Sequence, residues 1–143
     1  MTSRAARVRT SVLLGALLLA ACSPGPSTGA RERTIQVNGQ PVPVSSLREA
    51  VTGLCAALER LPTDPMAARD AFYALSHDRL HTIAAAVQEV DRAVAASLLQ
   101  SKAVVEEDLA RFPFPASLAA DLDRLTAATR AALGALSIRT EPC

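Results

Sequence analysis

The longest stretch of this chain without a glycine or a proline runs from Met66 to Phe112, 47 residues in all. As one α-helix it would be about 70 Å long, far more than the shorter helices on either side could cover. We therefore expect a break at residues 90–92, where Asp91 can cap a new helix, and a kink or a break at Ser76 fits the pattern as well. Whichever of these positions interrupts the helix, the stretch predicts a helical domain.

Prolines and capping residues mark the ends of the other helices. Ser46 and Glu49 form a capping box ahead of a leucine stripe, which predicts a helix over residues 47–61 that ends before Pro62. Asp64 followed by Pro65 is a typical start for the next helix. A last apolar stripe follows residues 112–115 and consists of Leu118, Leu122, Leu125, Leu133 and Leu136.

These elements predict an all-α domain over residues 46–143, folded as an up-and-down bundle because short connections make sequential helices antiparallel. The bundle has three helices if residues 65–111 stay continuous and four if they break. A short β-hairpin is expected at residues 34–45, since Asn38-Gly39 is a strong hairpin signal. Pro41 and Pro43 confine its second strand to an edge.

The N-terminal region has the pattern of an export signal. Three arginines and an apolar run too short to span a bilayer precede Leu19-Ala20-Ala21-Cys22. This pattern resembles the lipobox of bacterial lipoproteins, and an ordinary secretory signal with a chance cysteine is the alternative. The resemblance implies that residues 1–21 are a signal peptide and that Cys22 is lipidated. Residues 22–33, rich in Pro, Gly and Ser, are then a flexible tether on the extracytoplasmic face of the cell membrane, anchored to it by lipid.

Charge and composition exclude some partners. Cleavage before Cys22 would leave 12 basic and 14 acidic residues, because the signal holds three of the 15 basic residues and no acid. No basic cluster remains apart from Arg31 and Arg33, so we expect no nucleic-acid binding. Three Phe, one Tyr and no Trp argue against a deep pocket for an organic ligand.

Cys55 and Cys143 are the cysteines that remain once Cys22 carries lipid. An even number of cysteines in a compartment that permits disulfides favours a bridge between them. A catalytic thiol or a pair of metal ligands is the alternative, but no base or orienting group lies beside Cys55 in the sequence. The bridge would close a long loop and stabilise the fold by roughly 4–5 kcal/mol.

His77 and His81 are the candidate metal ligands, because two imidazoles four residues apart lie on one helix face. With further ligands such a pair could hold Cu, Zn or Fe. The apolar stripe places both rings on the shoulder or solvent side of the helix, so we expect only weak Cu or Zn binding. The acidic run Glu106-Glu107-Asp108 is expected to be a solvated face, with a salt-bridge partner or a cation as the alternative.

The segments FYALSHDRLHTIAAAV and LLQSKAVVEEDL, with the closing cysteine, are similar to those of small Ala- and Arg-rich helical lipoproteins of high-GC Gram-positive bacteria. That resemblance implies a location and a fold but no activity. The sequence shows no catalytic Ser/His/Asp set, no paired catalytic carboxylates and no Gly-rich phosphate loop. We expect a non-enzymatic interaction or structural module without a cofactor, which meets a partner protein of the envelope. The alternative is a transition-metal-binding lipoprotein that uses His77 and His81.

Overall fold

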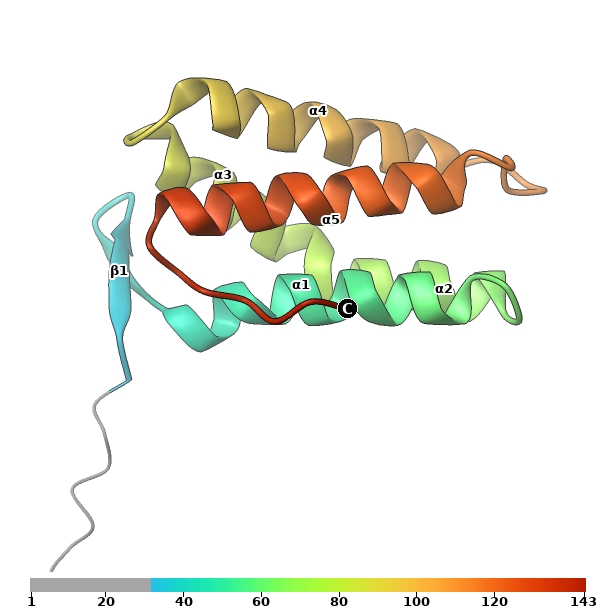
Figure 1. Cartoon of the computed structure of the whole chain (residues 1–143), viewed down its shortest axis with the longest axis horizontal. Coiled ribbons are helices and arrows are strands. Elements are labelled where there is room, and N and C mark those ends of the chain that lie inside the picture. Colours follow the sequence, from blue (N-terminus) through green and yellow to red (C-terminus); the bar gives the residue numbers. More distant parts are fainter. Residues whose placement is uncertain (1–31) are drawn as a thin grey trace, which may run out of the picture. The chain divides into compact units, whose positions relative to one another are not determined.

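The computed structural model describes residues 32–143, which are mainly helical and include one two-stranded antiparallel sheet (Figure 1). The prediction of a helical domain preceded by a hairpin is confirmed in this outline. The predicted signal peptide (1–21), the lipidation site Cys22 and all but the last two residues of the tether (22–33) lie outside the described residues. None of the described helices has both the length and the apolar character that crossing a membrane requires.

The hairpin forms where the Asn-Gly pair predicts it. β1 (Thr34–Val37) and β2 (Gln40–Pro43) pair antiparallel, with Ile35 opposite Val42. The two turn residues have φ of 51° and 76°, the left-handed region that a two-residue hairpin turn requires. Ile35 and Val42 pack against the helical core, which stabilises a hairpin that would be marginal alone.

α1 (Val44–Arg60) begins directly after β2, so the predicted capping box is wrong. Ser46 lies inside the first turn, and Pro43 occupies the N-cap position without a side-chain hydrogen bond. The N–H of Val44 donates instead to the carbonyl of Arg33, 2.9 Å away. The early start buries Val44, and this packing outweighs the local capping signal. The last two residues of the predicted hairpin therefore belong to the helix.

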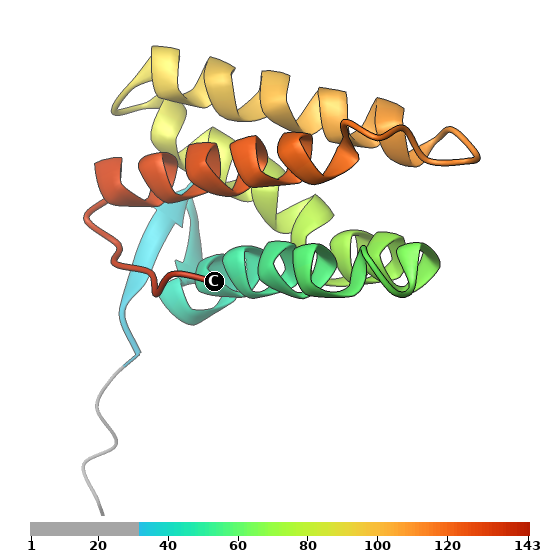
Figure 2. The ribbon, with the colours of Figure 1, turned by 45° about the vertical axis from the view of Figure 1, so that its right-hand side comes forward.

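A π-helical turn interrupts the long stretch at Ser76, one of the two expected positions. α2 (Pro65–Ala71) begins as predicted, with the Asp64 carboxylate accepting a backbone hydrogen bond in its first turn. The π-helical turn η1 (Phe72–Ser76) follows and leads into α3 (His77–Gln88). In both views α2 lies beside α1, whereas α3 runs away from α1 toward α4 (Figures 1 and 2). The chain therefore changes direction at η1.

The second break lies at residues 89–91, as Asp91 predicts. α4 (Arg92–Leu109) begins after it, and the Asp91 carboxylate accepts hydrogen bonds from the N–H groups of Ala93 and Val94, at 2.9 and 3.1 Å. Because the helix bends at η1 and is broken at residues 89–91, a single straight helix does not form, and the shorter helices can cover one another.

α5 (Leu118–Ala135) packs against α4, α1 and α3 and completes the core. Four of the five leucines predicted for its apolar face are buried, and Leu136 is half-buried just beyond its end. Most other core side chains are Leu, Val and Ala, and Phe72 is the one fully buried aromatic residue among residues 32–143. The C-terminal segment (residues 136–143) then runs back along α1 (Figure 1).

Candidate functional site

His77 and His81 lie one turn apart at the start of α3, directly after the π-helical turn. Their ring centroids are 5.4 Å apart in an edge-to-face arrangement. The side chain of His77 is 28% exposed and His81 is exposed, which matches the predicted position on the shoulder and solvent side of the helix. Tyr73 of η1 packs on the other side of His77, with 5.5 Å between the centroids.

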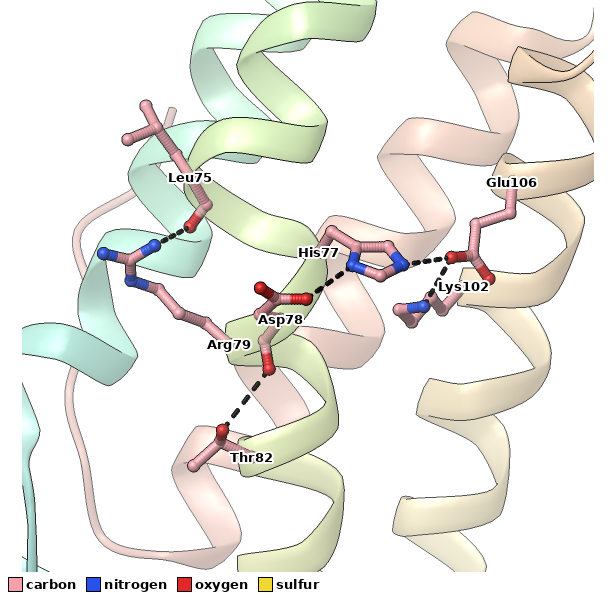
Figure 3. A network of polar contacts seen from close by, with 7 residues as sticks. All are labelled: Leu75, His77, Asp78, Arg79, Thr82, Lys102 and Glu106. Carbon is pink, nitrogen blue, oxygen red and sulfur yellow. Dashed lines mark hydrogen bonds and ion pairs between the residues drawn. The ribbon is translucent and has the colours of Figure 1, made fainter.

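The His77 ring contacts a carboxylate at each of its nitrogens (Figure 3). Nδ1 lies 2.8 Å from Asp78 Oδ1, and Nε2 lies 2.7 Å from Glu106 Oε1 on α4. Asp78 follows His77 directly in α3, so the first of these contacts is local to the helix. The contact with Glu106 joins α3 to α4.

Glu106 also accepts a hydrogen bond from Lys102, whose Nζ lies 2.6 Å from the same carboxylate oxygen (Figure 3). The Lys102 side chain is 2% exposed, and a buried ammonium group needs such a partner. Burial tends to raise the pKa of Glu106, but the hydrogen bonds and charges of Lys102 and His77 hold that pKa below its usual value. Glu106 is therefore in contact with His77 of α3 and with Lys102 of its own helix, α4.

The acidic run at residues 106–108 is only in part the solvated face that its sequence suggests. Glu106 makes the cross-helix contacts described above, and Glu107 pairs with Arg111 one turn later. Asp108 is buried, with only 5% exposed. The prediction of a solvated face therefore holds for Glu107, whose side chain is 67% exposed, and is wrong for Asp108, which is buried between α4 and α5. The alternative of a salt-bridge partner holds for both glutamates.

Two buried carboxyl groups, Asp108 of α4 and Asp121 of α5, lie close enough to interact with each other. Burial and the neighbouring Asp121 raise the pKa of Asp108, whereas Arg124 holds the pKa of Asp121 below its usual value. The Ser117 hydroxyl also donates to Asp108 Oδ2, at 3.3 Å. The contact between α4 and α5 therefore buries a pair of interacting carboxyl groups inside the bundle.

The sulfur atoms of Cys55 and Cys143 are 2.05 Å apart, at disulfide distance, as predicted. The bond joins α1 to the end of the C-terminal segment across a sequence separation of 88 residues. Arg130 of α5 lies beside it, with a guanidinium nitrogen 3.4 Å from Cys143 Sγ. The bridge thus holds a segment without regular secondary structure against the helices.

Sequence reasoning missed Lys102 and Asp121, although each occupies a position on an apolar stripe. Lys102 lies four residues after Leu98 and three before Val105, and both of these are buried. A charged residue inside a stripe of helical period signals a buried ion pair, and this signal could have identified Lys102. Asp121 lies at the same kind of position, three residues after Leu118.

Within residues 32–143, no group of three or more His, Cys, Asp or Glu side chains is arranged to hold a metal ion. The contacts of His77, Glu106 and Lys102 form a polar network between α3 and α4. No family model, curated protein or solved structure matches this chain. Its function is therefore inferred from its own residues.

Proposed function

We propose that this protein is a lipid-anchored lipoprotein on the extracytoplasmic face of a bacterial cell membrane. The sequence Leu19-Ala20-Ala21-Cys22 after a short apolar run carries this proposal. Cys55 and Cys143 at disulfide distance support it, because disulfides persist mainly outside the cytoplasm. Fatty acids on Cys22 would supply the anchor, since two or three acyl chains hold a protein stably where one does not.

The folded domain, in this proposal, is a non-enzymatic interaction or structural module of the envelope. His77 and Glu106 are the side chains best suited to acid–base chemistry, and both are engaged in the contact between α3 and α4. This structural use of the two residues supports a non-enzymatic role. The helices form an up-and-down bundle of four passes, in which α2, η1 and α3 make one bent pass. Such a domain offers helix faces to a partner protein without needing a cofactor.

Growth with a labelled fatty acid tests the anchor. We expect the wild type to carry the label and to sediment with membranes, and Cys22→Ser to stay unlabelled as uncut precursor, because processing in this family requires the lipidated thiol. Cys143→Ser is the matched control, since it removes a different cysteine and should keep the label. Equal label on the wild type and on Cys22→Ser would refute the proposal.

Transition-metal binding through His77 and His81 is the second candidate function. The short separation of the two rings, 5.4 Å between centroids, favours it. A metal ion would have to compete with Glu106 for Nε2 of His77, which lies 2.7 Å from that carboxylate. The affinity expected for Cu(II) or Zn(II) is therefore weak.

A further inference from the structure

The C-terminal segment (residues 136–143) has no regular secondary structure, yet arginines from three other parts of the fold hold its backbone. Arg33, just ahead of β1, donates to two of its carbonyl oxygens at 3.1 and 3.2 Å. Arg48 of α1 and Arg130 of α5 each donate to one further carbonyl oxygen at 3.0 Å. With the disulfide at Cys143, these bonds fix the segment against the helices.

These arginines are held by backbone carbonyls and not by ion pairs. Within the part of the chain that the structure describes, no acidic side chain forms a salt bridge with any of the four arginines at this segment: Arg33, Arg48, Arg130 and Arg139. A backbone carbonyl satisfies a guanidinium N–H group without cancelling its charge. The C-terminal segment is therefore a place where cationic groups accumulate and an anion would be attracted.

A pocket of about 520 Å³ lies between α1 and the C-terminal segment. Arg48 and Thr52 line it from α1, and Arg139 and Thr140 line it from the segment. Glu141 is the one carboxylate side chain among the lining residues. The rest of the wall is apolar or carries sulfur and consists of Val51, Cys55, Pro142 and Cys143.

We propose that this pocket binds an organic phosphate. Two guanidinium groups and two threonine hydroxyls supply donors from both walls, which suits the several oxygens of a tetrahedral anion. The pocket is larger than a phosphate group and falls within the size range of small-molecule sites, so the apolar wall is left for the organic part. The C-terminal segment is already held in place by hydrogen bonds and the disulfide, so little conformational entropy is lost there when a ligand binds. The site does not depend on the lipid anchor.

Titration calorimetry of the full-length protein in a neutral detergent tests this site with two soluble probes. Glycerol 3-phosphate represents a free phosphate monoester, and glycerophosphoglycerol represents the phosphodiester headgroup of an anionic lipid. We expect one probe to bind at one-to-one stoichiometry. A preference for the monoester assigns the pocket to a soluble phosphate, and a preference for the diester assigns it to a lipid headgroup.

Charge-removing variants locate the binding. Arg139→Gln should weaken it by about tenfold or more, because this side chain lines the pocket and makes no hydrogen bond within residues 32–143 that the fold would lose. Arg48→Gln should weaken it as well. Arg60→Gln is the matched control, since Arg60 is exposed at the end of α1 and lies outside the pocket. The site is refuted if neither probe binds at millimolar concentration, or if Arg139→Gln binds as tightly as the wild type.

Discussion

Gly53 of α1 lies so close to Ser76 of the π-helical turn that a Cβ atom on Gly53 would stand 2.3 Å from Ser76 Oγ. The same hydroxyl donates to the carbonyl of Ala50 at 2.8 Å, and all three residues are buried. The absent side chain at Gly53 lets η1 pack onto the backbone of α1. This contact holds the bend between α2 and α3, and with it the position of His77 opposite α4.

Gly53→Ala should lower the free energy of unfolding by about 2–3 kcal/mol, because the added methyl group overlaps Ser76 and forces η1 away from α1. Gly134→Ala is the matched control, since a Cβ there meets nothing within 4 Å in helix α5. It should raise the stability by about 0.5–1 kcal/mol through helix propensity. Urea unfolding followed by circular dichroism measures both. A neutral Gly53→Ala would contradict the close packing.

Reduction of the Cys55–Cys143 bond should lower the free energy of unfolding by roughly 4 kcal/mol, because the unfolded chain regains the freedom of a long closed loop. The double variant Cys55→Ala/Cys143→Ala should be as unstable as the reduced protein and should not respond to reductant. Thiol titration of the unreduced, unfolded wild type should detect no free thiol at Cys55 or Cys143. Two reactive thiols from these positions would show that they are unpaired.

Glu106→Gln should destabilise the fold by about 2–3 kcal/mol at neutral pH, because it leaves the buried ammonium of Lys102 without a carboxylate. In the folded protein the pKa of Glu106 lies below its usual value. The contribution of Glu106 to the free energy of unfolding is therefore present above the usual pKa and is lost as the pH falls through the lowered pKa. The difference between variant and wild type should therefore shrink in acid. Glu107→Gln, which removes only an exposed ion pair, should change little.

Asp108→Asn should stabilise the protein at neutral pH, because the ionised carboxylate is disfavoured at this buried position beside Asp121. Burial and the neighbouring Asp121 raise the pKa of Asp108 in the folded protein. The contribution of Asp108 to the free energy of unfolding is therefore fully present below its usual pKa and is lost as the pH rises through the raised pKa. The uncharged amide avoids that loss. Unfolding at neutral and at mildly acidic pH should show the advantage only at the higher pH. Asp123→Asn, an exposed carboxylate on α5, is the control and should show no such change.

Calorimetric titration with Cu(II) or Zn(II) at neutral pH should show only weak binding, which His77→Ala abolishes. A tight site needs three or four converging ligands, and protons compete for the imidazoles. In the structure, both nitrogens of His77 already contact carboxylate oxygens. Sub-micromolar affinity at one-to-one stoichiometry, lost in either His77→Ala or His81→Ala, would instead favour the metal-binding function.

The parts of the fold that depend on neighbouring residues were predictable from the sequence. Asp64 and Asp91 cap the helices that follow them, and the Asn38-Gly39 turn lies between the two strands. Each of these features is decided by hydrogen bonds and backbone angles within a few residues. The capping box at Ser46 failed for a tertiary reason, since burial of Val44 moves the start of the helix.

The candidate sites depend on contacts between distant residues. Most helix ends, and the two cysteines that could pair, were predictable from the sequence alone. Caps and prolines act within a few residues, and the cysteines left over after Cys22 can be counted. Three further contacts could be found only in the folded chain: Glu106 meets His77, Asp108 meets Asp121, and Arg48 and Arg139 line one pocket. Those pairs depend on how each helix is rotated and where the chain bends. Both are decided by the packing of the whole core, including the space that Gly53 leaves open for Ser76.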